Sequence, residues 1–370
     1  MTNVSIVKCK GYGLNKLIES IENSLKFLGG IEKFIQPGQK VLLKPNLLKI
    51  AHPDTAVTTH PEFIRAVVKV VKKKTPHIFI GDSPGGLIKI DELYDQCGIL
   101  KIVQDENIKL VKFDNIVMSG EIPFARVKDE VDVIVSLPKF KTHNLTMITA
   151  AVKNMFGLVA GLYKVQCHKQ APNFRVFAKE LARIYGMVKP HLTIMDAVVA
   201  MQGPGPAAGD PYPLNLILAG DDAVALDAVI TKIIGVDPFV VPTTKEAAAL
   251  NLGEGNLKKI NICGEPLEKV RVFDFKLPQI MMLGKIPNFI AAALLRLIPL
   301  MMSIDDLKCN KCLMCKDICP QGAISRQKGK MKINFKHCIL CLCCSEICPA
   351  NAVYLRFLRR RKVEKHNSYC

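Results

Sequence analysis

Eight cysteines near the end of the chain repeat one spacing twice, and this repeat restricts the fold more than any other feature. In each copy, two residues separate the first three cysteines, three residues precede the fourth, and a proline follows it. Three closely spaced thiolates suit three irons of one [4Fe–4S] cubane, while the cysteine before proline reaches the other cluster. The spacing therefore predicts two [4Fe–4S] clusters, cluster I on Cys309, Cys312, Cys315 and Cys348, and cluster II on Cys338, Cys341, Cys344 and Cys319.

Zinc knuckles and disulfides are the other common uses of a cysteine-rich segment. Zinc sites generally combine two CxxC pairs across a longer spacer, and disulfide frameworks do not repeat this spacing with its proline. Residues 305–356 resemble bacterial-type ferredoxins, which implies a small α+β domain that carries the two clusters and transfers electrons. Cys343 lies among the ligands but outside their register, so it is either a spare thiol shielded by the fold or a substitute ligand.

Composition narrows the class of protein further. With 370 residues, of which 49% are apolar, the chain can bury a sizeable core and is expected to form two domains. The formal net charge of +18 invites a nucleic-acid partner, but the chain has no finger, no helix-turn-helix and no Trp, so we expect none. The cysteines outside the repeat are scattered and the start of the chain lacks a secretion signal, which together predict a cytoplasmic protein.

Hydrophobic periodicity predicts strands that alternate with helices before the cysteine-rich segment. Apolar runs predict strands at residues 4–7, 41–43, 77–80, 108–113, 131–137, 191–199 and 215–219, with closing strands at 259–263 and 270–275. Helices are predicted at residues 14–28, 61–74, 91–97, 173–187 and 222–234. This alternation indicates an α/β domain over residues 1–278, with a mostly parallel sheet covered by helices.

Residues 279–304 join the two domains, and residues 357–370 form a basic tail. The apolar run in the join is shorter than the roughly 20 residues of a membrane-spanning helix, so it predicts a linker helix packed between the domains. A helix lying on a membrane surface is the alternative. The tail is either a solvated end or a contact surface for an acidic redox partner or an anionic membrane.

Polar side chains collect where predicted strands end. Lys44 and Asn46 follow one strand, Asp82 follows the next, and a third strand is followed by Lys139, Lys141 and His143. Ligands of open parallel sheets bind at the carboxyl ends of the strands, so we expect these groups to line one crevice. Lysines in such a crevice suit a ligand that carries a phosphate or a carboxylate.

Lys153 and Asn154 stand in an apolar stretch, where a lysine must reach either water or a partner. Solvated strand-end lysines and a hydrogen-bonded structural histidine are the plainer interpretations of the polar residues. The functional prediction is that His143 or Asp82 transfers protons and that an anionic small molecule is bound by Lys44, Asn46, Lys139, Lys141, Lys153 and Asn154.

Five segments before the cysteines resemble the family catalogued as domain of unknown function 362. They are KPN at 44–46, GDSPG at 81–85, LPKxKTH at 137–143, KNxFG at 153–157, and AGDD at 219–222 with ALD at 225–227. Members often carry a ferredoxin-like segment at the C-terminus, so the resemblance implies the fused architecture but no particular reaction.

The main functional hypothesis is an oxidoreductase of ferredoxin type. It passes single electrons from two [4Fe–4S] clusters to an anionic substrate or cofactor in the α/β domain. The alternative is a non-catalytic electron-transfer adaptor that docks a partner redox enzyme.

Overall fold

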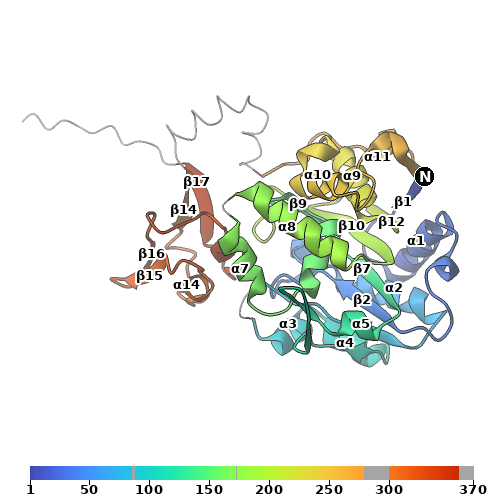
Figure 1. Ribbon diagram of the computed structural model, residues 1–370, viewed down its shortest axis with the longest axis horizontal. Helices are drawn as coiled ribbons and strands as arrows, with labels where there is room; N and C mark the ends of the chain where they lie inside the picture. Colours follow the sequence, from blue (N-terminus) through green and yellow to red (C-terminus); the bar gives the residue numbers. More distant parts are fainter. Residues whose placement is uncertain (86–87, 172, 279–299, 358–370) are drawn as a thin grey trace, which may run out of the picture.

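The computed structural model describes residues 1–85, 88–171, 173–278 and 300–357 (Figure 1). A mixed sheet of eleven strands forms the centre of the α/β domain, with its main path in the order β13-β1-β12-β10-β7-β2-β3-β4. These strands are β1 (Thr2–Lys8), β2 (Val41–Pro45), β3 (Ile78–Ile80), β4 (Lys109–Leu110), β7 (Val133–Leu137), β10 (Leu192–Gln202), β12 (Leu216–Gly220) and β13 (Ile260–Gly264).

Most neighbouring strands on this path pair in parallel. β10, β7, β2, β3 and β4 are parallel in succession, and β1 is parallel to β13, whereas β12 is antiparallel to both of its neighbours. Every residue of β2 and β7 is buried, as expected where helices cover both faces of a sheet. The predicted mostly parallel α/β fold is confirmed.

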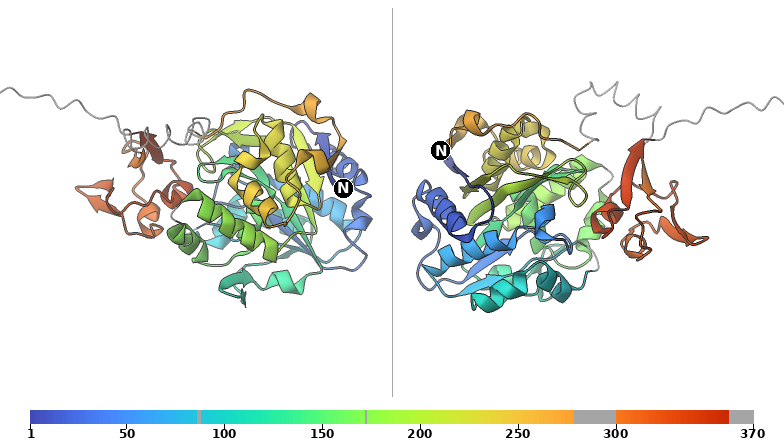
Figure 2. Two further views of the ribbon diagram at one scale, coloured as in Figure 1. Left: turned by 45° about the horizontal axis from the view of Figure 1, so that its top comes forward. Right: turned by 180° about the vertical axis from the view of Figure 1, so that it is seen from behind.

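Alternate residues of each central strand serve opposite faces of the sheet. Val41 and Leu43 pack into one core with α1 (Leu14–Lys26) and α2 (Pro61–Lys72), whereas Leu42 packs into the other. That second core contains α8 (Phe174–Met187), α9 (Ala223–Ile233) and α10 (Pro242–Ala249) (Figures 1 and 2). The period of two along the strands thus divides the apolar residues between two helical layers.

The remaining elements of this domain are short. The helices are α3 (Ile90–Gln96), α4 (Ile99–Asp105), α5 (Val127–Glu130), α6 (Ala151–Asn154), α7 (Tyr163–Gln170) and α11 (Leu267–Val270). The strands are β5 (Ile116–Ser119), β6 (Ile122–Ala125), β8 (Lys139–His143), β9 (Met147–Thr149) and β11 (Asp210–Tyr212). β8 extends the path of β7 beyond Pro138 and pairs with β10 and β9.

The predicted closing strand at residues 270–275 is wrong. The short helix α11 ends at Val270, and the backbone N–H of Val272 then bonds to the carbonyl of Ile233 in α9. Val270 is buried at the end of α11, which packs against α9, whereas the ring of Phe275 packs against Phe140 of β8 and Tyr212 of β11 without pairing as a strand. Their apolar character marked burial correctly, but it could not show which surface buries them.

The C-terminal domain is a small α+β unit beside α7 (Figure 2). β14 (Leu300–Ile304) pairs with β17 (Val353–Phe357), β15 (Ile324–Gln327) pairs with β16 (Lys330–Ile333), and the helices are α14 (Met314–Asp317) and α15 (Cys343–Ile347). The linker helix predicted over 279–304 is therefore wrong at its end, because residues 300–304 form a strand of this domain.

The remainder of the predicted linker, at 279–299, lies outside the described residues, as does the basic tail from residue 358 onwards. The membrane and partner contacts predicted for these two segments stay predictions. Among the residues that are described, no helix has the length and apolar character needed to cross a membrane.

Candidate functional site

Four cysteines line each of two small cavities in the C-terminal domain. One cavity is bordered by Cys309, Cys312, Cys315 and Cys348, and the other by Cys319, Cys338, Cys341 and Cys344. Each set combines three neighbouring cysteines with the fourth cysteine of the other copy, which is the grouping that the spacing predicts. Within the described ranges, no three His, Cys, Asp or Glu side chains are gathered around a site for a single metal ion.

The backbone of the two cysteine loops repeats together with the cysteines. Lys311 and Leu340, 29 residues apart, have φ angles of 60° and 55°, and Leu313 and Leu342 have 68° and 64°. Non-glycine residues seldom adopt positive φ because of steric conflict at Cβ. Four such residues in matched positions show that both loops adopt the same sterically unfavourable backbone conformation. In this conformation the cysteines of each loop line a cavity.

Backbone N–H groups also donate to the fourth cysteine of each copy, the one that is grouped with the three cysteines of the other copy. Ala323 donates to Sγ of Cys319 and Ala352 donates to Sγ of Cys348, each over 3.3 Å. Such donors stabilise negative charge on a thiolate and are one means by which a protein adjusts an iron–sulfur cluster. The donor set and its surroundings therefore fit four-iron clusters.

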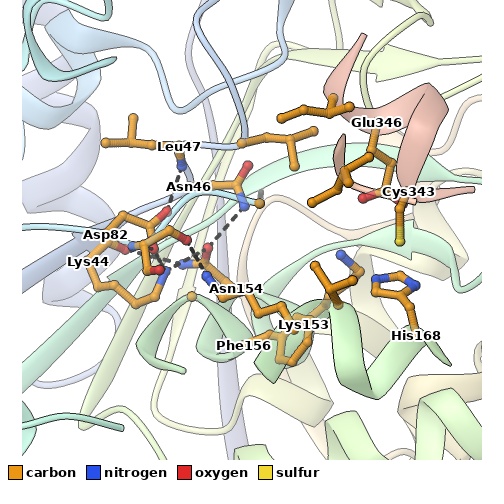
Figure 3. Close-up of a pocket in the computed structure, with 18 residues that line it drawn as sticks. Lys44, Asn46, Leu47, Asp82, Lys153, Asn154, Phe156, His168, Cys343 and Glu346 are labelled. Atoms are coloured by element: carbon orange, nitrogen blue, oxygen red, sulfur yellow. Dashed lines mark hydrogen bonds and ion pairs between the residues drawn. The ribbon is translucent and has the colours of Figure 1, made fainter. Parts of the chain in front are cut away.

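A separate cavity of about 80 Å³ lies between the α/β domain and helix α15 (Figure 3). Its α/β wall comes from the ends of β2 and β3, from α6 and from α7, and its other wall comes from Ile318, Cys343, Glu346 and Ile347. The predicted residues that line it are Lys44, Asn46, Asp82, Lys153 and Asn154, whereas Lys139, Lys141 and His143 do not border it.

Lys44 and Asp82 form a buried ion pair at the base of this cavity. Nζ of Lys44 lies 2.7 Å from Oδ1 of Asp82, and the backbone N–H of Leu47 donates to Oδ2 over 2.7 Å. Burial lowers the pKa of Lys44, and the charge of Asp82 opposes that shift. Gly157 packs so closely that a Cβ at this position would collide with both charged groups, so only glycine fits there.

Lys139 and Lys141 bind protein groups instead of facing the cavity. Nζ of Lys139 lies 2.9 Å from Oδ2 of Asp196 and 2.8 Å from the hydroxyl of the partly buried Tyr12, and the side chains of Lys139 and Asp196 are fully buried. Lys141 donates to Oδ1 of Asn46 over 2.7 Å and thereby fixes the amide that borders the cavity. The parallel pairing of β8 with β10 places Lys139 opposite Asp196.

His143 connects the two domains. The backbone N–H groups of Leu145 and Thr146 donate to its Nδ1, so in the neutral ring the proton is on Nε2, which lies 3.2 Å from Oε1 of Glu346. Burial, helped by the charge of Lys153, lowers the pKa of His143 to about 4. This geometry favours the structural interpretation, in which a neutral imidazole holds a carboxylate of the C-terminal domain.

The carboxylate of Glu346 lies among three basic side chains, His143, His168 and Lys153. Burial raises its pKa, but the electrostatic interaction with His143, followed by those with His168 and Lys153, outweighs burial and keeps the pKa below its ordinary value. Burial lowers the pKa of Lys153, and the charge of Glu346 opposes that shift.

Among the residues that border the cavity, sequence reasoning missed four with ionisable side chains, namely Lys164, His168, Cys343 and Glu346. Lys164 donates to the carbonyls of Ser83 and Pro84, and burial lowers its pKa to about 7. Lys164 and His168 are four residues apart, a spacing that puts two residues on one face of a helix and could have linked them. No local signal connects Cys343 and Glu346 to the α/β domain.

Asp227 does not border the cavity, but it binds the start of α6, which does. Its carboxylate accepts hydrogen bonds from the backbone N–H groups of Ala151 (2.7 Å) and Val152 (3.1 Å) at the start of α6. These bonds orient the turn that carries Lys153 and Asn154. Asp227 belongs to one of the segments that carry the family resemblance, although its position in the sequence shows no role.

The fold and the cysteine sets define an iron–sulfur protein in which an α/β domain precedes a ferredoxin-type domain. A 4Fe-4S dicluster domain model matches residues 301–349. The chain belongs to the family described as Domain of unknown function (DUF362), whose model matches residues 41–232.

Among curated proteins, the chain is 33% identical over 287 residues to "Thylakoid-associated protein sll1697" of Synechocystis sp., covering 76% of this chain and 89% of that protein. Two solved structures are similar at a low level. The lactate racemase apoprotein of Thermoanaerobacterium thermosaccharolyticum has a TM-score of 0.40, is 10% identical and covers 61% of this chain. A protein of Thermotoga maritima has a TM-score of 0.37, is 12% identical and covers 66% of this chain. The chain spans 55% and 60% of those two solved chains.

Proposed function

We propose that the protein is a two-cluster electron-transfer protein that works as an oxidoreductase. Cys309, Cys312, Cys315 and Cys348 would hold one [4Fe–4S] cluster, and Cys319, Cys338, Cys341 and Cys344 the other. Such clusters supply one-electron chemistry when bound. The electron acceptor in this proposal is an anionic small molecule in the cavity between the domains.

One observation carries the proposal: the cavity wall is built from the segments that bear the predicted cluster ligands. Cys343 precedes Cys344, and Ile318 precedes Cys319, and both Cys343 and Ile318 border the cavity. A molecule bound there lies against the iron–sulfur domain on one side and against the strand-end loops on the other. The ligand would thus be bound and would receive electrons from the clusters at the same site.

The α/β wall would supply recognition. Lys153 and Asn154 come from α6 and Asn46 from the end of β2, and all three border the cavity. A lysine ammonium attracts carboxylate or phosphate as a point charge, and the amides offer both donors and acceptors. Proton transfer by Asp82 stays a prediction; its two oxygens already accept three hydrogen bonds, from Lys44, Leu47 and Ser83.

The test is anaerobic single-turnover kinetics. Protein that contains roughly eight iron and eight sulfide per chain is reduced by a low-potential donor, and its reoxidation by small carboxylates and phosphate esters is followed by absorbance. At least one acceptor should accelerate reoxidation, and Lys153→Met should slow it at least tenfold. Lys179→Met, at an exposed position of α8, is the matched control. Zinc in place of iron, or equal rates in both variants, would overturn the proposal.

A second candidate function is the adaptor, and a surface groove of about 670 Å³ favours it. The groove has exposed apolar side chains, Ile116, Met118 and Leu162, and reaches Cys319 and Pro320. An apolar surface beside a predicted cluster ligand suits a docked redox protein. An adaptor would keep electron transfer to its partner enzyme after Lys153→Met and lose it after Met118→Asp with Leu162→Asp.

A cytoplasmic location and the docking of a redox partner protein are parts of this proposal. No nucleic-acid partner is proposed.

A further inference from the structure

The charged groups around the cavity between the domains nearly balance. Its lining contains three lysines, Lys44, Lys153 and Lys164, and two carboxylates, Asp82 and Glu346. Lys44 is paired with Asp82, and Glu346 lies between His143 and Lys153. With all three lysines protonated, one positive charge is in surplus. Uncompensated buried charge is costly, so the lining suits one negative charge on a ligand and no more.

Two buried side-chain atoms on the lining, Nδ1 of His168 and Oε1 of Glu346, have no hydrogen-bond partner of good geometry within the part of the chain that the structure describes, although Oε1 lies 3.2 Å from Nε2 of His143. The ammonium group of Lys153 also borders the cavity, and it forms no ion pair within 4.0 Å of a carboxylate of the described residues. The side chain of His168 is buried, with an exposure of 8%. Figure 3 shows Lys153 and His168 converging on the same side of the cavity, next to Cys343. Unpaired buried polar atoms such as Nδ1 of His168 are rare in proteins, and a bound molecule would pair with this nitrogen and with the ammonium group of Lys153.

The size of the cavity limits the ligand further. Its volume of about 80 Å³ is roughly half of the ~150 Å³ of an engineered apolar cavity that binds benzene. A nucleotide or a flavin ring cannot be enclosed in this space. Much of the remaining lining is apolar, including Leu47, Phe156 and Ile347, so the ligand should also carry a short carbon skeleton.

We propose that the cavity binds a small monocarboxylate of about two to four carbons, with the carboxylate beside Lys153 and a second polar atom beside Nδ1 of His168. Inorganic phosphate fits less well, because near neutral pH it carries more than one negative charge and has no carbon. The inference deepens the proposed function, and it rests on that proposal only in taking this cavity as the ligand site.

The experiment is calorimetric titration of the cluster-containing full chain under anaerobic conditions, with acetate, glycolate, glyoxylate, succinate and inorganic phosphate as probes. At least one monocarboxylate should bind at least tenfold more tightly than succinate or phosphate. Lys153→Met should weaken that binding at least tenfold, Lys153→Arg should retain part of it, and Lys179→Met should leave it unchanged. Binding should also change the electron paramagnetic resonance spectrum of the reduced protein, because the ligand lies against α15.

Several results would overturn the inference. These are tighter binding of succinate or phosphate, absence of monocarboxylate binding, or equal affinity in wild type and in a Lys153→Met protein of unchanged iron content and circular dichroism. If a monocarboxylate binds but never reoxidises the reduced protein, the proposed electron transfer fails while the ligand class stands. If only larger anions reoxidise the protein, the ligand class fails and the proposed function stands.

Discussion

The ammonium group of Lys49 donates hydrogen bonds of 2.8 Å to the carbonyl oxygen of Cys348 and to Oδ1 of Asn351. Lys49 belongs to the loop after β2 in the α/β domain, and Cys348 is a predicted ligand of cluster I. The side chain of Lys49 is almost fully buried. The larger domain therefore places a cation directly beside the iron–sulfur domain.

Replacing Lys49 should make one of the clusters harder to reduce. Reduction adds an electron, so loss of a nearby positive charge disfavours the reduced state. For Lys49→Met we expect one midpoint potential to fall by the order of 60 mV, a tenfold change in the one-electron equilibrium constant. A redox titration followed by electron paramagnetic resonance measures this, and Lys49→Arg should restore most of the difference. Two unchanged potentials in Lys49→Met would show that the cation has no electrostatic role.

Lys139 should matter for stability and not for ligand binding. Its ammonium group is enclosed by Asp196 and Tyr12 and does not border the cavity between the domains. Lys139→Met leaves Asp196 buried without its cation, which typically costs about 3–5 kcal/mol of unfolding free energy. Urea denaturation should show the loss, while ligand affinity at a temperature where the variant is folded should match the wild type. A selective loss of affinity would restore the substrate-binding role predicted from the sequence.

Asp227 should give the folded protein a pH-dependent stability. Burial raises its pKa to about 7, although the N–H groups of Ala151 and Val152 oppose the shift. In an unfolded chain the pKa of Asp is about 3.9, so the folded state binds this proton more tightly. The resulting stabilisation is complete below about pH 4 and is lost as the pH rises through about 7.

Over the whole window this contribution of Asp227 corresponds to about 4 kcal/mol. Urea midpoints measured between pH 5.5 and 7.5 should therefore fall with pH in the wild type and fall less in Asp227→Asn. Parallel pH profiles in the two proteins would contradict the raised pKa.

Lys164 should make anion binding pH-dependent. Burial lowers its pKa to about 7; the nearby charge of Asp82 opposes this shift, while Lys44 and Lys153 reinforce it. Below pH 7 the ammonium group contributes a positive charge to the cavity, and above pH 7 that charge is lost. The affinity for a carboxylate should drop several-fold between pH 6 and 8, as measured by calorimetry. Lys164→Met should bind weakly at both values, and a similar pH dependence in that variant would assign the titration to another group.

The sheet and the cysteine sets could be predicted because their signals are local. The buried run of β2 at Val41–Pro45 needs only an apolar stretch, and the cysteine spacing needs only a loop that can surround a cluster. The strand expected at residues 270–275 is wrong because apolar side chains can be buried without strand pairing, as Val270 is at the end of α11 and Phe275 is against the rings of Phe140 and Tyr212. Hydrophobicity indicates burial without specifying the surface that provides it.

The candidate site was predictable only on its α/β side. Lys44 lies near the carboxyl end of β2 and Asp82 follows the parallel neighbour β3, and the rule for strand ends brings them together. The same rule suggested a ligand for Lys139, but the pairing of β8 with β10 gives that lysine to Asp196. Strand register decides which lysine is paired with a carboxylate, and this register cannot be read from the sequence.

By itself, the sequence determined the alternation of strands and helices and the cysteine grouping, because periodicity and spacing act over short distances along the chain. Only the tertiary structure decided that Glu346 and Cys343 close the cavity that begins at Lys44 and Asn46. The contact of His143 with Glu346 joins residues about 200 positions apart. Such contacts arise from the packing of two domains that are distant in the sequence, and the composition of neither segment specifies them.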